Sequence, residues 1–250
     1  MKRLYQTNGF NLLLMAIIIG CFLMTACDIN QPSAKQNEKI NIEKEVLPNA
    51  VTDMDGNSYS AVKIGEQVWM KENLRTTKYA DGTPIELGST TSTTTPYRYY
   101  PNDDSTNVYT YGYLYNWKAV MRNSSSSSSN PSGTHGICPT GWHVPSDAEW
   151  KQLKDYLGGT DVAGGKMKEA GTFHWCSPNE GADNSSDFSA LPAGGYYGNY
   201  NHFGTYAAYW SATGYNNDNA YYCYLYHPRA RVGFYNNDKN YGYSVRCLRD

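Results

Sequence analysis

Four side chains of kinds that carry out chemistry lie close together in the segment GICPTGWHVPSDAEWKQL, residues 136–153. They are the thiol of Cys138, the imidazole of His143 and the carboxylates of Asp147 and Glu149. Groups of these kinds serve as nucleophiles, acids, bases or metal ligands. Neither CxxC nor HxxxH, two spacings typical of zinc sites, occurs in the chain. We therefore expect neither a metal nor a catalytic residue here.

The two carboxylates of this segment are better explained as the start of a helix. Ser146 and Glu149 form the Ser-x-x-Glu capping box, in which each side chain accepts a hydrogen bond from the backbone of the other residue. Asp147 falls in the first turn, where the helix dipole favours a negative charge. Apolar residues then recur at helical spacing before a glycine pair: Trp150, Leu153, Leu157, Gly158 and Gly159. The pattern predicts a helix from Asp147 to Leu157.

A second group of reactive side chains lies in HWCSPN, residues 174–179, where His174 is close to Cys176. A Cys–His nucleophile needs its base within hydrogen-bond reach and a third group that orients the base. Near neighbours in sequence seldom reach that geometry, so we assign no catalytic role to this pair. A short helix is expected before it, around Val162 to Glu169.

The N-terminus is typical of a bacterial lipoprotein signal peptide, residues 1–26. Two basic residues precede an apolar run, Leu12–Met24, that is too short for a comfortable membrane span. A small residue stands before Cys27, which is the expected site of lipid attachment. Cys21 also fits the pattern, but cleavage there would leave an apolar terminus. Ordinary secretion of a soluble product is the remaining alternative.

The 6 cysteines have different expected uses. If Cys21 is removed and Cys27 carries the lipid, four remain: Cys138, Cys176, Cys223 and Cys247. Disulfides persist in exported proteins, and four cysteines allow three pairings. We expect two disulfides, and the residues alone leave the pairing open.

The charge balance argues against one class of partner. Removal of residues 1–26 changes 21 basic and 23 acidic side chains to 19 and 23, a net charge near −4. Nucleic-acid binding needs clustered lysine and arginine to meet phosphates, so we expect no nucleic-acid partner. Membrane attachment would depend on the N-terminal lipid. No cofactor is indicated.

The rest of the chain predicts a tether and one domain. Residues 27–48 are polar and free of aromatic side chains, so we expect a flexible tether. Residues 49–250 suit a single domain. The domain is rich in Tyr, Gly, Asn and Ser, and few long segments have the periodicity of an amphipathic helix. This composition favours short strands.

Three segments of the domain predict strands. YTYGYLYNW, residues 109–117, alternates with period two, which would place one set of aromatic side chains on one face: Tyr109, Tyr111, Tyr113, Tyr115 and Trp117. YYCYLY, residues 221–226, and YGYSVRCLRD, residues 241–250, are the other two. They place Cys223 and Cys247 on core-facing sides.

Tyrosine suggests where a ligand could bind. Of the 24 tyrosines, ten lie between Tyr206 and Tyr243, interleaved with Asn and Asp. Aromatic faces stack on sugar rings, and amphipathic tyrosine is favoured in binding surfaces. The motif YNND occurs twice. The candidate ligand-binding residues are Tyr215, Asn216, Asp218, Tyr222, Tyr224, Tyr235, Asn236 and Asp238.

These candidates have structural alternatives. Asn and Asp tolerate the backbone angles of tight turns, so both YNND copies could be turns. Their oxygens also suit calcium, but no ligand spacing is diagnostic, and we predict no metal. Many tyrosines could fill a core that has few Leu, Ile and Phe residues.

Six segments in order carry a resemblance to a known family: DMDGNSYSAVKIGEQVWMKENLRTTKYADGTPI (53–85), YGYLYNWKAV (111–120), GICPTGWHVPSDAEWKQL (136–153), SSDFSALPAGGYY (185–197), YWSAT (209–213) and YSVRCLRD (243–250). Together they resemble the Fibrobacter succinogenes major paralogous domain, a family of exported proteins and lipoproteins common in the Bacteroidetes and Fibrobacteres. The similarity runs from about Val51 to Asp250.

The resemblance implies an α+β fold of the C-type-lectin-like kind, with a small twisted antiparallel sheet, one or two helices and long loops. It also implies the disulfides Cys138–Cys247 and Cys176–Cys223. The broad fold group includes the formylglycine-generating oxidases, which have a close pair of copper-binding cysteines. Here Cys223 and Cys247 lie on separate predicted strands, so the resemblance does not extend to that site.

We therefore expect a lipoprotein anchored in the cell envelope, at the outer membrane, that carries a non-catalytic recognition domain for a glycan or another surface protein. The first alternative is a structural component of the envelope or of a surface appendage. An oxidase of the formylglycine-generating type is the second. The identity of the ligand and the oligomeric state do not follow from the sequence.

Overall fold

The computed structural model describes residues 42–250. The predicted signal peptide, Cys21, Cys27 and residues 27–41 of the predicted tether lie outside the described residues. The elements are β1 (Lys44–Thr52), β2 (Ser58–Ile64), β3 (Gln67–Met70), β4 (Glu86–Leu87), β5 (Tyr97–Tyr99), η1 (Pro101–Asp103), η2 (Ser105–Asn107), α1 (Val108–Tyr111), β6 (Leu114–Asn116), α2 (Trp117–Met121), β7 (Trp142–His143), α3 (Asp147–Tyr156), α4 (Thr160–Met167), β8 (Gly195–Tyr196), β9 (Tyr200–Asn201), β10 (Tyr206–Gly214), β11 (Asn219–Tyr226), β12 (Val232–Asp238), β13 (Gly242–Tyr243) and β14 (Leu248–Arg249).

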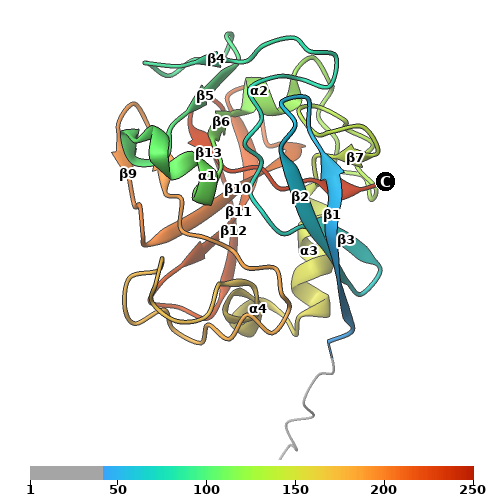
Figure 1. Ribbon diagram of the computed structural model, residues 1–250, viewed down its shortest axis with the longest axis vertical. Helices are drawn as coiled ribbons and strands as arrows, with labels where there is room; N and C mark the ends of the chain where they lie inside the picture. The colour runs from blue at the N-terminus through green and yellow to red at the C-terminus, as the bar shows by residue number, and fades with distance from the viewer. Residues whose placement is uncertain (1–41) are drawn as a thin grey trace, which may run out of the picture. The chain divides into compact units, whose positions relative to one another are not determined.

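The described strands form three sheets connected by long loops (Figure 1). A five-stranded sheet has the order β1-β2-β3-β14-β7, a three-stranded sheet the order β10-β11-β12, and a six-stranded sheet the order β4-β5-β6-β13-β8-β9. The pairs are antiparallel apart from β4 with β5, which is parallel. Short helices accompany the sheets, so the predicted α+β class is confirmed.

The folded part of the chain begins earlier than the sequence predicts. β1 starts at Lys44, inside the segment expected to be a tether, and pairs with β2 from Lys44 opposite Ile64 to Thr52 opposite Ser58. The burial of β1 is low along its length, because it is an edge strand. A polar composition is compatible with an edge strand, since its stability comes from backbone pairing and not from a buried face. Regular structure therefore begins at Lys44, before the predicted domain boundary at residue 49.

The helix predicted from the capping box is confirmed. The Ser146 hydroxyl accepts the Glu149 N–H at 3.2 Å, and Glu149 Oε2 accepts the Ser146 N–H at 2.8 Å. α3 ends at Tyr156, and Leu157 is its C-cap. The second predicted helix is also present, displaced toward the N-terminus, as α4.

α4 packs unusually close to the segments beside it. A Cβ atom added at Gly165 would lie 2.2 Å from the backbone oxygen of Gly181, a distance that real Cβ atoms do not adopt. The Gly165 N–H also donates to the oxygen of Ala230 at 2.7 Å. Glycine is costly inside a helix, and here it is required because backbone lies directly against backbone.

The predicted strand at residues 109–117 is wrong. Its first residues form α1, Gly112 follows with φ of 72°, and only Leu114–Asn116 form a strand, β6, before α2 begins. The left-handed angle at Gly112 interrupts the period-two alternation. Tyr109 is 83% exposed whereas Tyr115 is fully buried, so the aromatic side chains do not share a face.

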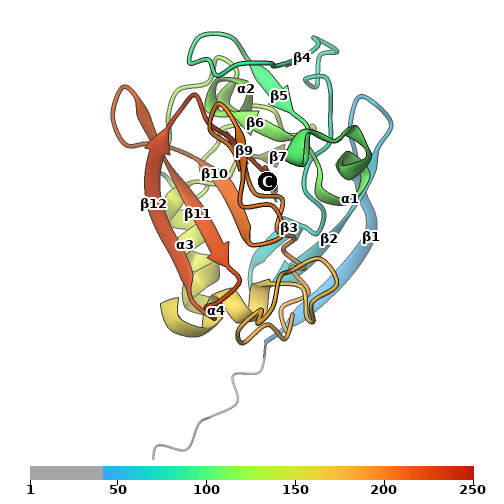
Figure 2. The same cartoon turned by 90° about the vertical axis from the view of Figure 1, so that its left-hand side faces the viewer.

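The sheet β10-β11-β12 separates two cores. Alternate residues of its strands point to opposite faces. Ala208, Trp210 and Tyr222 belong to one core, which also contains residues of β2, β3 and β13. Tyr209 and Cys223 belong to the other, which is covered by α3 and α4 (Figure 2).

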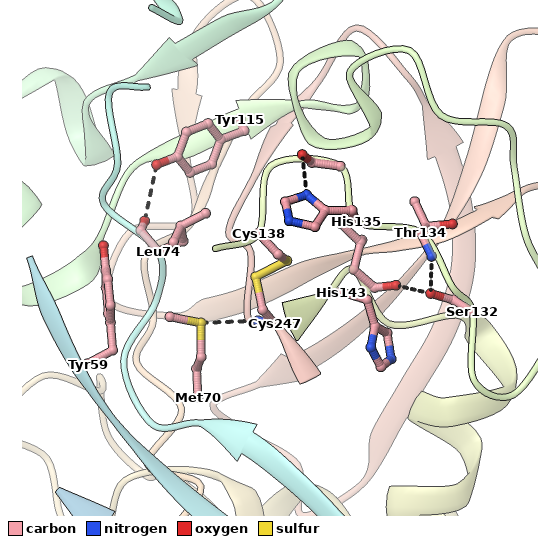
Figure 3. Close-up of a disulfide and its surroundings, with 12 residues drawn as sticks. Tyr59, Met70, Leu74, Tyr115, Ser132, Thr134, His135, Cys138, His143 and Cys247 are labelled. Carbon is pink, nitrogen blue, oxygen red and sulfur yellow. Dashed lines mark hydrogen bonds between the residues drawn. A yellow bond between two sulfur atoms is a disulfide. The ribbon is translucent and has the colours of Figure 1, made fainter. Parts of the chain in front are cut away.

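The disulfide Cys138–Cys247 is present, as the family resemblance implies (Figure 3). Both residues are fully buried in the first core. The Cys247 N–H donates to the sulfur of Met70 at 3.4 Å, and its carbonyl accepts the Met70 N–H at 3.1 Å. The bridge therefore connects the segment before α3 to the end of the chain and to β3.

The predicted disulfide Cys176–Cys223 is not formed, and both residues are free thiols. Cys223 lies in the middle of β11 with its side chain in the core under α3 and α4. Cys176 is exposed in a loop, where its N–H donates to the oxygen of Gly204 at 2.7 Å. A cysteine on the covered side of a central strand cannot reach one on an exposed loop.

The segment 241–250 is predicted as one strand but forms two short ones, β13 and β14. Between them the Ser244 N–H donates to Ala208 at 3.0 Å, and the Ser244 oxygen accepts the Trp210 N–H at 3.2 Å. The segment thus leaves the six-stranded sheet, contacts β10, and enters the five-stranded sheet. The predicted core-facing position of Cys247 is nevertheless confirmed.

Candidate functional site

The His143 region is a buried polar cluster with all of its reactive groups engaged. His143 is 3% exposed, and its ring nitrogens lie 2.9 Å from Glu149 Oε1 and 2.7 Å from Asp250 Oδ1. Glu149 Oε2 accepts the N–H groups of Ser146 and Ser132. The cluster connects the capping box of α3 to the last residue of the chain, which is a structural role.

The protonation of His143 follows from these contacts. Burial alone would lower the pKa of His143, but the hydrogen bonds and charges of Glu149 and Asp250 outweigh it and raise the pKa above its ordinary value. An imidazolium donates from both nitrogens, so it is the form that satisfies both carboxylates.

The other two reactive groups of the segment 136–153 are also engaged. Cys138 is in the disulfide, and Asp147 forms an ion pair with Lys151 at 2.5 Å. The prediction that this segment carries a helix start is confirmed by the structure. His174, in the second reactive segment, faces Glu169 at 2.8 Å and not Cys176.

Two buried cations stabilise the loop between α4 and β8. Lys168 Nζ donates to the backbone oxygens of Glu180 at 2.9 Å and Arg229 at 3.0 Å. Burial lowers the pKa of Lys168 to about 8. Arg246 is 1% exposed and donates through Nη2 to the oxygen of Ser189 at 2.9 Å. Because Lys168 Nζ and Arg246 Nη2 donate to backbone oxygens, these cations are positioned to hold the loop.

A cavity of about 430 Å³ opens on the face of β10-β11-β12 that is turned away from α3 and α4. Its volume lies within the range of small-molecule sites. Five of the residues that line it are tyrosines, and the other two are a histidine and an asparagine: Tyr197, His202, Tyr206, Tyr222, Tyr226, Asn237 and Tyr243. We call it the tyrosine cavity.

Strand pairing brings the wall of the cavity together. Tyr206 stands opposite Tyr226 in the register of β10 and β11, and Tyr222 and Tyr226 share a face of β11. Asn237 stands opposite Ala220, so its side chain is on the same face. Tyr243 comes from β13, which is hydrogen-bonded to β8.

The tyrosines hold one another in place. The rings of Tyr222 and Tyr243 are stacked with centroids 4.9 Å apart. The Tyr206 hydroxyl donates to that of Tyr222 at 3.2 Å, and Asn237 Nδ2 donates to the Tyr243 hydroxyl at 2.9 Å. Side chains fixed in this way give up little conformational freedom when a ligand binds.

Burial keeps the hydroxyl groups of four lining tyrosines protonated near neutral pH. Burial is the largest cause that raises the pKa of Tyr206, Tyr222 and Tyr243. Neighbouring tyrosines raise the pKa further at Tyr206 and Tyr243, whereas hydrogen bonds with these two residues oppose the rise at Tyr222. Burial also raises the pKa of Tyr197 to about 12. The lining therefore presents neutral hydroxyl and amide groups together with aromatic rings.

The sequence-predicted residues of this region are only partly brought together. Tyr222 lines the cavity. Tyr224 lies beside it, with its ring stacked on Tyr206 at 5.5 Å and close above the backbone of Gly233. Tyr235 is opposite Tyr222 in the register and is 64% exposed on the same face.

The first YNND copy is a turn and lies apart from the cavity lining. Tyr215, Asn216 and Asp218 connect β10 to β11, and Asn216 Oδ1 accepts the Asp218 N–H at 2.9 Å. Lys239 Nζ donates to the backbone oxygens of Asn216 and Asn217 at 2.7 and 3.0 Å, so an ammonium group lies against this turn.

The second YNND copy lies within β12 instead of a turn. Asn236 and Asp238 point to the face opposite Asn237. Asn236 Oδ1 accepts a hydrogen bond from Asn219 at 3.0 Å, which fixes the end of the sheet. In residues 42–250 no group of three or more His, Cys, Asp or Glu residues could hold a metal ion.

The sequence interpretation missed six of the seven lining residues: Tyr197, His202, Tyr206, Tyr226, Asn237 and Tyr243. The concentration of tyrosine after residue 206 is the signal that was available. It identifies the region, but the alternation of β11 and the approach of β8 and β13 decide which side chains face the cavity.

A family model, the Fibrobacter succinogenes major domain, matches residues 62–249. The chain belongs to this family. The match includes the three sheets apart from β1 and the first residues of β2, and it includes the disulfide and the tyrosine cavity, so these are parts of the Fibrobacter succinogenes major domain. No curated protein and no solved structure matches the chain. Within residues 42–250, no helix has the length and apolarity needed to cross a membrane.

Proposed function

We propose that this domain is a non-catalytic recognition module for neutral glycans, with a fold of the C-type-lectin-like kind. The tyrosine cavity is the observation that supports the proposal. Its aromatic rings offer flat apolar surfaces, and its hydroxyl and amide groups both donate and accept hydrogen bonds. A sugar ring presents the same two features, an apolar face and a rim of hydroxyl groups.

The lining has no lysine, arginine, aspartate or glutamate side chain, which favours a neutral ligand. Binding of an anionic ligand depends on arginine or lysine, and none of these lines the tyrosine cavity within the described chain. The cavity is open to solvent at Tyr226 and His202, which are part-exposed or exposed. A ligand can therefore enter without a change in the fold.

We further propose that the domain is carried on a lipoprotein of the cell envelope, with the lipid on Cys27. The signal-peptide pattern of residues 1–26 supports this part of the proposal. Replacement of Cys27 by serine should release the protein from the membrane fraction and abolish labelling by a fatty-acid analogue. Unchanged fractionation and labelling would contradict the assignment.

The glycan proposal is tested by a screen of immobilised neutral glycans, followed by titration of the ligands that bind. Asn237→Ala removes one hydrogen-bonding group and should weaken binding about fivefold, since such a bond contributes about 1 kcal/mol. Tyr226→Ala removes an aromatic wall and should weaken binding about tenfold or more.

Tyr215→Ala is a matched control. Tyr215 is an exposed tyrosine of the same sheet, but it lies in the β10–β11 turn and does not line the cavity. Its removal should leave the affinity unchanged. Loss of binding in Tyr215→Ala, with full binding in Tyr226→Ala and Asn237→Ala, would show that the ligand uses another surface.

The alternatives give different results in the same experiments. A structural component of the envelope should bind no glycan and should co-purify with other envelope proteins. An oxidase should bind copper through free thiols at Cys223 and Cys247. Against the oxidase, Cys247 is bonded to Cys138, and Cys223 is 1% exposed with a pKa raised by burial.

A further inference from the structure

A second hollow lies close to the tyrosine cavity and has a different chemistry. Its volume is about 480 Å³, and its lining includes Leu87, Tyr100, Asp103, Tyr196, Asn199 and Tyr200. We call it the second cavity. It lies where β4, the loop before β5, η1 and the β8–β9 hairpin meet. It takes no part in the contacts described above.

The second cavity combines aromatic surface with polar groups. The rings of Tyr196 and Tyr200 lie 4.9 Å apart, and Leu87 is 44% exposed beside them. The Asp103 carboxylate is exposed at the rim. A carboxylate can accept two hydrogen bonds, and two neighbouring hydroxyl groups on a sugar ring can donate them.

Tyr200 is held as a neutral hydrogen-bonding group. Burial and the negative charge of Asp103 raise the pKa of Tyr200 to about 12. The cavity thus offers a phenol, a carboxylate and the Asn199 amide around an aromatic floor. This set suits a ligand that has hydroxyl groups on its edge and an apolar face.

The two cavities share one wall, the β8–β9 hairpin. Tyr197 lines the tyrosine cavity, and its neighbours in sequence, Tyr196 and Gly198, line the second cavity. Tyr196 ends β8, and Tyr197 begins the turn. Consecutive Cα atoms are about 3.8 Å apart, so the linings of the two cavities meet along this hairpin.

The turn of this hairpin has a glycine at its centre. Residues 197–199 form the turn, and Gly198 and Asn199 are exposed. A Cβ atom at Gly198 would meet only a methyl group of Thr91 at 3.9 Å. No side chain at Gly198 therefore stands between the two cavities, and a chain-like ligand can pass across the turn.

We propose that the tyrosine cavity and the second cavity are two subsites for one extended neutral oligosaccharide, which crosses the turn of the β8–β9 hairpin. This inference rests on the proposed glycan function and adds that the ligand is a chain of several sugar units. The tyrosine cavity holds one part of the chain, and Tyr200 and Asp103 hold another. A disaccharide occupies only one subsite.

The test is a titration with cello-, malto- and manno-oligosaccharides, each from the disaccharide to the hexasaccharide. In the series that binds, the dissociation constant should fall at least tenfold between the shortest and the longest member, because two linked contacts act together. Tyr200→Ala and Asp103→Asn should remove most of this gain and leave disaccharide binding unchanged. Two variants are used because Tyr200→Ala could disturb the packing of its aromatic neighbours. Asp103 is exposed, so Asp103→Asn tests the same cavity without removing an aromatic ring.

Tyr109→Ala is the matched control, since Tyr109 is 83% exposed and lines neither cavity. It should behave as the parent protein. Equal affinity for the disaccharide and hexasaccharide, or a length gain that survives both variants, would overturn the second subsite while the proposed function stands. Failure of all three series to bind would overturn the proposed function and the second subsite with it.

Discussion

Removal of the Cys138–Cys247 disulfide should cost about 5 kcal/mol of unfolding free energy. The two cysteines are 109 residues apart. In the chain-entropy model, closing a loop of that length lowers the entropy of the unfolded chain by about 16 cal/mol/K, or about 4.8 kcal/mol at 25 °C. Both sulfurs are fully buried. Their replacement by smaller groups therefore also leaves a void in the first core, which adds to the loss of unfolding free energy.

The perturbation is the double variant Cys138→Ala, Cys247→Ala, and the assay is urea unfolding followed by tryptophan fluorescence. Domains have total stabilities of roughly 5–15 kcal/mol, so the variant should retain at most about 10 kcal/mol and unfold at a much lower urea concentration than the parent protein. Cys176→Ser is the control. Because Cys176 is an exposed free thiol, its replacement should change the stability by less than about 0.5 kcal/mol.

A loss below about 1 kcal/mol in the double variant would refute the reasoning, because the loop would then be restricted by other means. Alkylation of the native, unreduced protein provides an independent check. Peptide mapping should find Cys176 labelled, Cys223 labelled only after unfolding, and Cys138 linked to Cys247. A linked Cys176–Cys223 peptide would restore the pairing that the structure contradicts.

Two further predictions concern His143 and α4. Since the pKa of His143 is raised in the folded state, its contribution to stability is complete below about pH 6.5, the ordinary histidine value, and is lost as the pH rises through the raised pKa. The free energy of unfolding of the parent protein should therefore fall over that range. His143→Ala should flatten this profile and cost about 3 kcal/mol, because it leaves Glu149 buried and unpaired. A pH profile that is the same in both proteins would contradict this role. Gly165→Ala should destabilise the protein by about 2 kcal/mol or more despite the better helix propensity of alanine, because its Cβ would meet the Gly181 oxygen at 2.2 Å. Val162→Ala, at an exposed position of the same helix, is the control and should change the urea midpoint of unfolding little. A stabilised Gly165→Ala would show that the packing of α4 is looser than described.

The parts of the fold that local interactions determine could be predicted from the sequence. The start of α3 depends on Ser146 and Glu149, which are three residues apart, so the pattern contains all the necessary information. The strand at β11 follows in the same way from its alternation. The disulfide of Cys138 needed the family resemblance as well, because no local pattern connects residues so far apart.

The errors arose where a distant part of the chain changes the local preference. The tyrosine-rich segment 109–117 alternates as a strand does, but the Leu74 oxygen accepts the Tyr113 N–H at 3.1 Å and Gly112 lies against the backbone of Leu74. These contacts bend the segment. β1 was missed for the opposite reason: its pairing with β2 is enough for a strand that has little apolar surface.

The candidate site could be predicted only as a region. Alternation along β11 separates Tyr222 from Cys223, but the sequence does not show which face is covered by helices and which is open. Residues such as Tyr197 and Tyr243 enter the site from strands that are not neighbours in sequence. The packing of these segments against one another decides which of their side chains line the cavity.

The two-faced sheet β10-β11-β12 also affects how such a domain can change during evolution. Residues on its helix-covered face, such as Cys223 and Leu225, contribute to the core. Tyr226 and Tyr235, on the other face, are part-exposed or exposed, so their replacement need not disturb the packing beneath α3 and α4. Under the proposed function, a duplicated copy of the gene can therefore acquire a new ligand preference through substitutions at alternate positions while the fold keeps its stability. Selection for the proposed recognition and selection for folding would then act on different residues of the same strands.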